Sequence, residues 1–237
     1  MEPKKPEHLA AFPAAFLERL QDSPEAAQFV LGGYFALKHY LDYRETGDVD
    51  AWWRSREDPR ALEAAREAFR QTADDFGYSV RERSWGETVS LEALDDTGNH
   101  LFSFQVAVRS IQVENPIASP WGSIAIETFA DNIASKMQAL VARGAPRDFV
   151  DIKKVVDASL VSITRCWELW AAKDPGITFS DARFRVRAHL ESIEARMPIE
   201  RLPAERRLAA SELRAWFRDE FTTRPGEGGR ELEEGLP

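Results

Sequence analysis

Four residues near the start of the chain have the types and spacing of a site for phosphate and metal. Gly32 and Gly33 stand at the expected start of a helix, where the lack of side chains leaves backbone amides open to an anion. Asp48 and Asp50 follow on an expected strand, so both carboxylates point to the same side. Two carboxylates beside a phosphate cradle suit the Mg²⁺ complex of a nucleoside triphosphate.

A second group of charged residues lies further along, on two expected helices. Lys136 falls on the apolar side of the first helix, where a lysine must snorkel, pair with a carboxylate or reach an anion. On the second helix Asp148 and Asp151 share a face, and Arg147 can pair with Asp151. These residues could bind a nucleotide, or they could form an ion-pair network that ties the two helices together. The sequence leaves both interpretations open.

The order of these motifs is similar to that of a known family. Gly32-Gly33, Asp48-x-Asp50, the run from Lys136 through Ala-Leu to an arginine, and Arg147-Asp148-x-x-Asp151 follow one another along the chain. Together they resemble the AbiEii/AbiGii-type toxins of the nucleotidyltransferase (polymerase-beta-like) superfamily, which belong to bacterial toxin–antitoxin and phage-defence modules. The resemblance covers residues 28–157.

The resemblance implies a bilobal ATP-binding or other NTP-binding transferase with Mg²⁺ as cofactor. Asp48 and Asp50 would hold the metal, and with Lys136 they would form the catalytic set. Gly32, Gly33, Lys136, Arg147, Asp148 and Asp151 would bind the nucleotide. The family implies nucleotide transfer from an NTP to RNA, in some members tRNA, and neutralisation by an antitoxin protein.

Two positions depart from the family pattern. Tyr34 follows the glycines where a serine or threonine is usual, so one phosphate-facing hydroxyl is missing or displaced. Gln105 stands where a third carboxylate is expected, and glutamine can neither take a proton nor bring charge to a metal. Glu92 on the neighbouring expected strand, or Glu127, could substitute for that carboxylate.

Composition and charge are those of an ordinary globular protein. Of 237 residues, 43% are apolar and 30% are charged, and no apolar run is long enough to span a membrane, which favours a cytoplasmic location. A single cysteine, Cys166, excludes a disulfide framework, and the four scattered histidines argue against zinc. Residues 136–218 hold 16 Lys and Arg against 11 Asp and Glu, although the whole chain has a net charge of −9. The basic segment is either an RNA-binding groove or a set of solvated helices.

The residue pattern predicts an α+β fold with a mixed β-sheet flanked by helices, followed by a helical C-terminal lobe. We expect the nucleotidyltransferase core at residues 1–127, the helical lobe at 128–222 and a disordered tail at 223–237. Within the core, the expected strands are 29–31, 48–53, 78–83, 88–94, 101–109 and 123–127. The expected helices are 7–21, 34–43, 58–76, 128–143, 146–157, 160–172, 179–195 and 204–221.

Three functions are compatible with these residues. The first is an active nucleotidyltransferase of the toxin type. The second, prompted by Tyr34 and Gln105, is a degenerate family member that binds a nucleotide or a protein without turnover. The third is a small-molecule adenylyltransferase of the antibiotic-modifying kind, which suits the acidic net charge.

Overall fold

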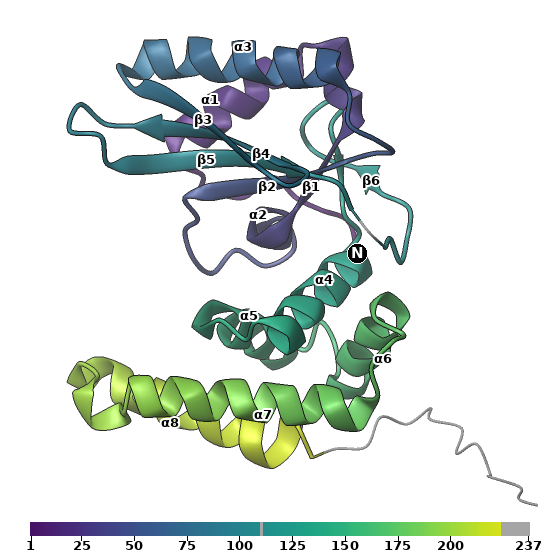
Figure 1. Ribbon diagram of the computed structural model, residues 1–237, viewed down its shortest axis with the longest axis vertical. Helices are drawn as coiled ribbons and strands as arrows, with labels where there is room; N and C mark the ends of the chain where they lie inside the picture. Colours follow the sequence, from purple (N-terminus) through teal and green to yellow (C-terminus); the bar gives the residue numbers. More distant parts are fainter. Residues whose placement is uncertain (110, 224–237) are drawn as a thin grey trace, which may run out of the picture. The chain divides into compact units, whose positions relative to one another are not determined.

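The computed structural model describes residues 1–109 and 111–223 (Figure 1). Apart from Thr223, the predicted disordered tail lies outside the described residues. The chain divides into two compact units, Met1–Asn132 and Ile133 onward. The division falls within helix α4 (Phe129–Ala142), a few residues after the boundary that we expected at 127.

The first unit contains a mixed β-sheet, and the predicted α+β class is confirmed. Seven strands in the described residues lie in the order β3-β4-β5-β2-β1-β7-β6. The pairs β2–β5 and β1–β7 are parallel, and the other neighbours are antiparallel. The strands are β1 (Phe29–Gly32), β2 (Asp48–Trp53), β3 (Ser79–Trp85), β4 (Thr88–Leu94), β5 (His100–Ala107), β6 (Ile117–Ala118) and β7 (Ala125–Ile126).

Helices α1 (Ala11–Leu20) and α3 (Pro59–Phe76) cover one face of this sheet, and α2 (Gly33–Lys38) lies on the other (Figure 1). The covered face holds an aromatic core in which Phe16, Phe69 and Phe104 are fully buried. Strand β2 alternates accordingly, because Val49, Ala51 and Trp53 are buried whereas Asp48, Asp50 and Trp52 are only partly buried. The two aspartates therefore share the face opposite the aromatic core.

Both ends of α3 have the capping residues that the sequence predicts. Asp58 precedes Pro59 and accepts hydrogen bonds from the backbone of Arg60 and Ala61. At the other end Gly77 adopts φ +70° and closes the helix, as predicted. Ser23 likewise caps the short 3-10 turn η1 (Pro24–Gln28).

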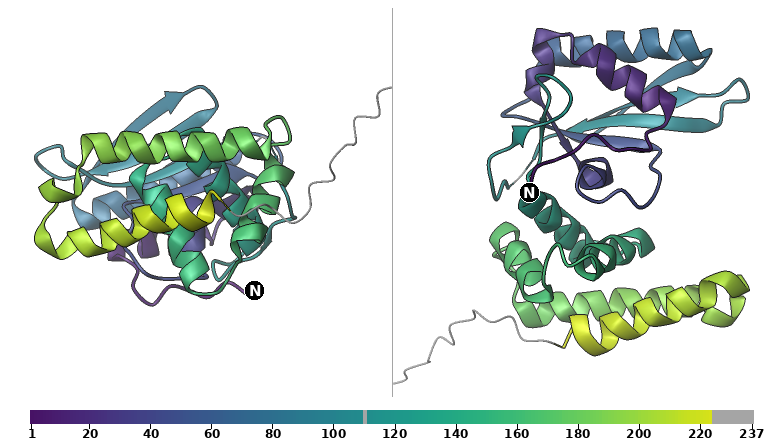
Figure 2. Two further views of the ribbon diagram at one scale, coloured as in Figure 1. Left: turned by 90° about the horizontal axis from the view of Figure 1, so that it is seen from below. Right: turned by 180° about the vertical axis from the view of Figure 1, so that it is seen from behind.

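The second unit is helical in its described part, as predicted. It contains most of α4, then α5 (Pro146–Asp157), α6 (Ile163–Lys173), α7 (Phe179–Arg196), the 3-10 turn η2 (Ile199–Arg201), α8 (Ala204–Trp216) and the π turn η3 (Phe217–Phe221). Helices α7 and α8 run side by side (Figures 1 and 2), and Arg218 of η3 pairs with Glu194 of α7 at 2.5 Å. Phe149, Trp167 and Phe217 are buried in its core.

Several helix boundaries differ from the prediction. Helix α1 begins at Ala11 rather than at residue 7, and α2 ends at Lys38 rather than at residue 43. Helix α6 begins at Ile163 rather than at residue 160, because the Ser162 side chain caps it by accepting from the Arg165 backbone. The last helix ends as an α-helix at Trp216 and widens into η3, where Phe217 and Phe221 turn into the core. Across the described residues, no helix is both long and apolar enough to cross a membrane.

Candidate active site

At the two glycines, the backbone lies close to the Asp50 and Trp52 side chains of strand β2. Gly33 begins α2 with φ +60°, a conformation that costs a side-chain-bearing residue about 1–2 kcal/mol. Gly32 and Asp50 are opposite each other in the antiparallel pair β1–β2. A Cβ on Gly33 would lie 2.7 Å from Cγ of Asp50, and one on Gly32 would lie 2.9 Å from Cε2 of Trp52. Glycine is therefore required at both positions by the neighbouring strand.

Helix α2 is too short to contribute much of a dipole. It has six residues, whereas the partial charge at a helix N-terminus comes from several aligned turns of peptide units. The Gly32-Gly33 turn therefore offers an anion little helix field. Gly33 stands at the start of this helix, as predicted.

The sheet register places Gln105 directly beside Asp50. Asp50 pairs with Gln105 and Asp48 with Ser103 across the parallel strands β2 and β5, so these four side chains share a face. The Gln105 amide donates to the Ser103 hydroxyl at 3.2 Å. Thr46 donates its hydroxyl to the Asp48 carboxylate. The position at which the sequence suggested a third carboxylate is thus adjacent to the aspartates and holds an amide.

The two substitute carboxylates differ in their surroundings. Glu92 lies opposite Ser103 in the pair β4–β5, on the same sheet face as the aspartates, and Arg81 pairs with it at 2.6 Å. Glu127 is fully buried, and its carboxylate accepts hydrogen bonds from Trp52 and Asn132. A general base must reach the proton that it removes. Glu92 therefore fits the sheet face better than Glu127 does.

Tyr34 takes a structural role in the loop before β2. Its hydroxyl donates to the Arg44 carbonyl and accepts from the Arg44 backbone amide, both at 3.0 Å. The Arg44 guanidinium lies over the Tyr34 ring, 3.4 Å from its centroid. The ring is 3% exposed. The hydroxyl expected near phosphate is therefore displaced onto the loop that leads to Asp48.

In the second unit, one ion pair joins α4 to α5, and a second joins Arg143, in the turn after α4, to α5. The Lys136 ammonium lies 2.7 Å from the Asp151 carboxylate, and Lys136 is 8% exposed while Asp151 is fully buried. Arg143 pairs with the buried Asp148 at 3.0 Å, and Asp148 also accepts from the Ala145 backbone. The sequence left the partner of Lys136 open, and the structure pairs it with the Asp151 carboxylate. The interpretation of a structural network between two helices fits Arg143 and Asp148, whereas Arg147 is exposed.

The donor set of the first unit suits Mg²⁺ only together with a substrate. No group of three His, Cys, Asp or Glu side chains in residues 1–109 and 111–223 is arranged to hold a metal. Mg²⁺ is commonly bound by one or two carboxylates, with phosphate oxygens and water as its other ligands. Asp48 and Asp50 on one face of β2, with the Gly33 backbone against Asp50, fit that pattern.

Comparison with known protein families identifies one that matches most of the chain. The model of the nucleotidyl transferase AbiEii toxin family, a Type IV TA system, matches residues 15–222. The chain belongs to the AbiEii nucleotidyl transferase toxin family. No curated protein matches its sequence.

Two solved structures resemble this AbiEii-family chain weakly. JHP933 from Helicobacter pylori is 13% identical, with a TM-score of 0.46 over 89% of this chain and 90% of that one. A structure described as a "putative nucleotidyltransferase from H. pylori" is 14% identical, with a TM-score of 0.46 over 89% of this chain and 93% of that one.

Sequence reasoning missed several polar residues of this AbiEii-family core. Arg109 pairs with Glu127 at 2.8 Å, and Asn132 donates to both Glu127 and the Gly33 carbonyl at 2.8 Å. Asn132 lies 99 residues after Gly33, and neither Arg109 nor Asn132 belongs to a motif. The available signal was Asn132 in the first turn of a helix whose other early residues are apolar or helix-capping.

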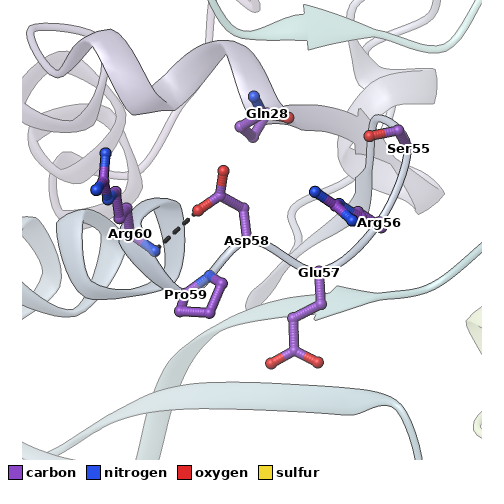
Figure 3. Close-up of a pocket in the computed structure, with 7 residues that line it drawn as sticks. All are labelled: Gln28, Ser55, Arg56, Glu57, Asp58, Pro59 and Arg60. Atoms are coloured by element: carbon purple, nitrogen blue, oxygen red, sulfur yellow. Dashed lines mark hydrogen bonds between the residues drawn. The ribbon is translucent and has the colours of Figure 1, made fainter.

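A hollow of about 640 Å³ lies in the connection between β2 and α3, away from these residues (Figure 3). Asp58 in its wall accepts from the Arg60 backbone and thereby caps α3. Its polar groups therefore serve the helix start, and none of the predicted site residues lines it. The lining residues are Gln28, Ser55, Arg56, Glu57, Asp58, Pro59 and Arg60.

Proposed function

We propose that this AbiEii-family chain is a Mg²⁺-dependent nucleotidyltransferase that moves a nucleotide from an NTP to RNA, acting as a toxin that an antitoxin protein neutralises. The observation that carries the proposal is the approach of Gly33 to Asp50. A glycine with φ +60° leaves room for a carboxylate that shares its strand face with Asp48. Such an arrangement favours a polyphosphate bound through metal over an ordinary structural turn.

In the proposed reaction an acceptor hydroxyl attacks the α-phosphorus of the NTP. The new P–O bond forms as the bond to pyrophosphate breaks, and the hydroxyl proton leaves to a base or to water. Asp48 and Asp50 would hold Mg²⁺, which neutralises phosphate oxygens. Catalysis then depends on positioning and charge stabilisation, for which the rigid Gly32-Gly33 turn is suited.

The base in this scheme differs from the usual family pattern. Gln105 lies beside Asp50 but cannot accept the acceptor proton. Glu92, on the same sheet face, is the carboxylate that we assign to this role, with Arg81 holding it in place.

The residues of the second unit have two roles in the proposal. Lys136 would neutralise the triphosphate, which requires its ammonium to be shared with or released from Asp151. Arg147, exposed on α5, would contact the nucleotide. Asp148 and Asp151 would act through the cations that they hold, Arg143 and Lys136.

The test is label transfer from each α-labelled NTP, with and without Mg²⁺, to total RNA and to aminoglycosides. Labelled RNA that appears only with Mg²⁺ would support the proposal, and loss of labelling in Asp48→Ala would exclude a contaminating enzyme. Labelled aminoglycoside without labelled RNA would show that the acceptor is a small molecule.

A second candidate is a nucleotide-binding protein without turnover, favoured by Gln105 beside Asp50. It predicts Mg²⁺-dependent NTP binding without any labelled product. Replacing Gln105 by Glu separates the two candidates, because the substitution adds the carboxylate that the family pattern expects. Nucleotide transfer by Gln105→Glu but not by the natural chain would show that the natural chain binds NTP without turnover.

A further inference from the structure

A buried polar cluster lies behind the Gly32-Gly33 turn, and we call it the Glu127 hub. It connects segments that are distant in the sequence, namely β2, the end of β5 and the first turn of α4. Burying so many polar groups is costly unless they are paired with one another. The hub comprises Trp52, Arg109, Glu127, Asp131 and Asn132.

Glu127 is the centre of the hub and is fully buried. Its Oε1 accepts from Trp52 Nε1 at 2.7 Å and lies 2.8 Å from Arg109, and its Oε2 accepts from Asn132 Nδ2 at 2.8 Å. Its backbone amide donates to the Leu31 carbonyl at 3.0 Å. Its carbonyl accepts from the hydroxyl of Tyr40 at 2.7 Å, and burial raises the pKa of that hydroxyl, so it remains a donor.

Arg109 supplies a positive charge to the hub, opposite the carboxylates of Glu127 and Asp131. Its side chain is 8% exposed and lies between two fully buried carboxylates, 2.8 Å from Glu127 and 2.5 Å from Asp131. Opposite charges this close together attract strongly where water is largely excluded. The orientation of Glu127 is therefore fixed, and Glu127 can act as a rigid support for its other partners.

Asn132 connects Glu127 to the backbone of the Gly32-Gly33 turn. Its Nδ2 donates to the Gly33 carbonyl and to Glu127 Oε2, both at 2.8 Å. Both partners at this end of the side-chain amide are hydrogen-bond acceptors. The atom at this end must therefore be the nitrogen, which donates. Asn132 is fully buried, so solvent does not compete for these bonds. Gly33 is in turn the residue whose missing side chain makes room for Asp50.

We propose that Asn132, held by Glu127 and Arg109, is a positioning residue that fixes the Gly33 backbone and thereby the place of the Asp50 carboxylate. The inference rests on the proposed function only for its effect on catalysis. Its structural content, a turn held by one side-chain amide, can be tested without any activity.

The principal test is Asn132→Asp in the full-length protein. Aspartate has the same shape but no donor, so it loses both hydrogen bonds and faces Glu127 with a like charge. We expect amide exchange at residues 33–35 to become at least tenfold faster. We also expect the rate of nucleotide transfer at saturating NTP to fall at least tenfold.

A double variant separates positioning of the turn from general stability. In Glu127→Gln/Asn132→Asp the glutamine amide can donate to the new aspartate, so the bond between these positions is restored in reverse. The Gly33 carbonyl still lacks its donor. We expect thermal stability to recover toward that of the natural chain, while fast exchange at residues 33–35 and slow transfer persist.

The matched control is Thr128→Ala, which removes the cap that Thr128 gives to the Asp131 backbone at the start of the same helix. It should lower thermal stability without faster exchange at residues 33–35. Equal exchange in the control and in Asn132→Asp would overturn the proposal, as would recovery of transfer in the double variant. If the natural chain transfers no nucleotide, the proposed function fails, yet the exchange comparison still decides the role of Asn132.

Discussion

The carboxylate of Asp50 occupies the space that a side chain on Gly33 would need. The two residues lie on different elements, the start of α2 and the strand β2, and the register of β1 with β2 brings them together. A glycine and an aspartate that the sequence presents as two separate motifs therefore form one structural unit. Changing either residue should disturb the other.

Gly33→Ala should abolish nucleotide transfer because the new methyl group displaces Asp50. Gly77→Ala is the matched control, since Gly77 has φ +70° and a Cβ there would meet nothing within 4 Å. Both variants should lose about 1–2 kcal/mol from backbone strain, measured by denaturant unfolding. Only Gly33→Ala should lose transfer and NTP affinity. Similar activities in the two variants would contradict a role for the contact with Asp50.

Asp48→Ala and Asp50→Ala should each reduce transfer by roughly 10²–10³-fold, as expected when a charge-stabilising group is removed. Both side chains are only partly buried on the open face of β2, so the free energy of unfolding should change by less than about 1 kcal/mol. Glu87→Ala, at an exposed turn, is the control and should keep full activity. An active Asp48→Ala enzyme would show that the metal role is wrong.

Lys136→Met should destabilise the protein. The substitution removes the cation 2.7 Å from the fully buried carboxylate of Asp151, which should cost about 3–5 kcal/mol. Lys136→Met/Asp151→Leu removes both charges and should recover most of that stability. NTP affinity in this double variant, measured by calorimetry, decides the function of Lys136. Affinity equal to that of the natural chain would mean that Lys136 is purely structural.

Acid should destabilise the first unit through His39. Burial lowers the pKa of His39 from 6.5 to about 4, and its Nε2 accepts from Trp121 Nε1 at 2.8 Å. The unfolded chain therefore binds a proton first, so stability is complete above pH 6.5 and falls by roughly 3 kcal/mol as the pH drops to 4. His39→Gln should flatten this part of the unfolding profile, whereas His100→Gln, at an exposed site, should not.

Arg185 is the best probe of an RNA-binding surface on α7, since it is exposed. Arg183 lies over the rings of Trp167 and Phe179, and Arg187 donates to Thr222 at 2.8 Å, so changing either would disturb packing. Arg185→Glu should weaken RNA binding and reduce the slope of log affinity against log salt by roughly 1. Arg60→Glu makes the same charge change in the first unit. Equal losses of RNA affinity in Arg185→Glu and Arg60→Glu would mean that RNA binding depends only on the net charge of the protein.

Local signals in the sequence predicted much of the fold. The N-cap Asp58, the closing Gly77 and the alternation of β2 are patterns within a few residues of each other, and the structure contains all of them. The shared face of Asp48 and Asp50 followed from the period of a strand. The pairing of Asp50 with Gln105 agrees with the position at which a third carboxylate was expected.

The parts that sequence reasoning missed depend on long-range contacts. Strand β6 has two residues and no pattern of its own, since it exists only by pairing with β7. Asn132 reaches the Gly33 carbonyl, 99 residues earlier in the chain, because the pairing of β1 with β7 brings these two segments together. Likewise, the spacing of Lys136 and Asp151 permitted several partners, and helix packing selects this pair.

The strand order also determines when the site can form during synthesis. Strand β2 is central in the sheet and pairs with residues 103–107 of β5, while β1 pairs with residues 125–126 of β7. At roughly 5–20 residues per second, a ribosome needs about 5–20 s to proceed from Gly33 to Asn132. Nascent chains interrupted in this interval carry the glycine turn without the amide that holds it. Premature termination before Asn132 therefore yields fragments with an incomplete site.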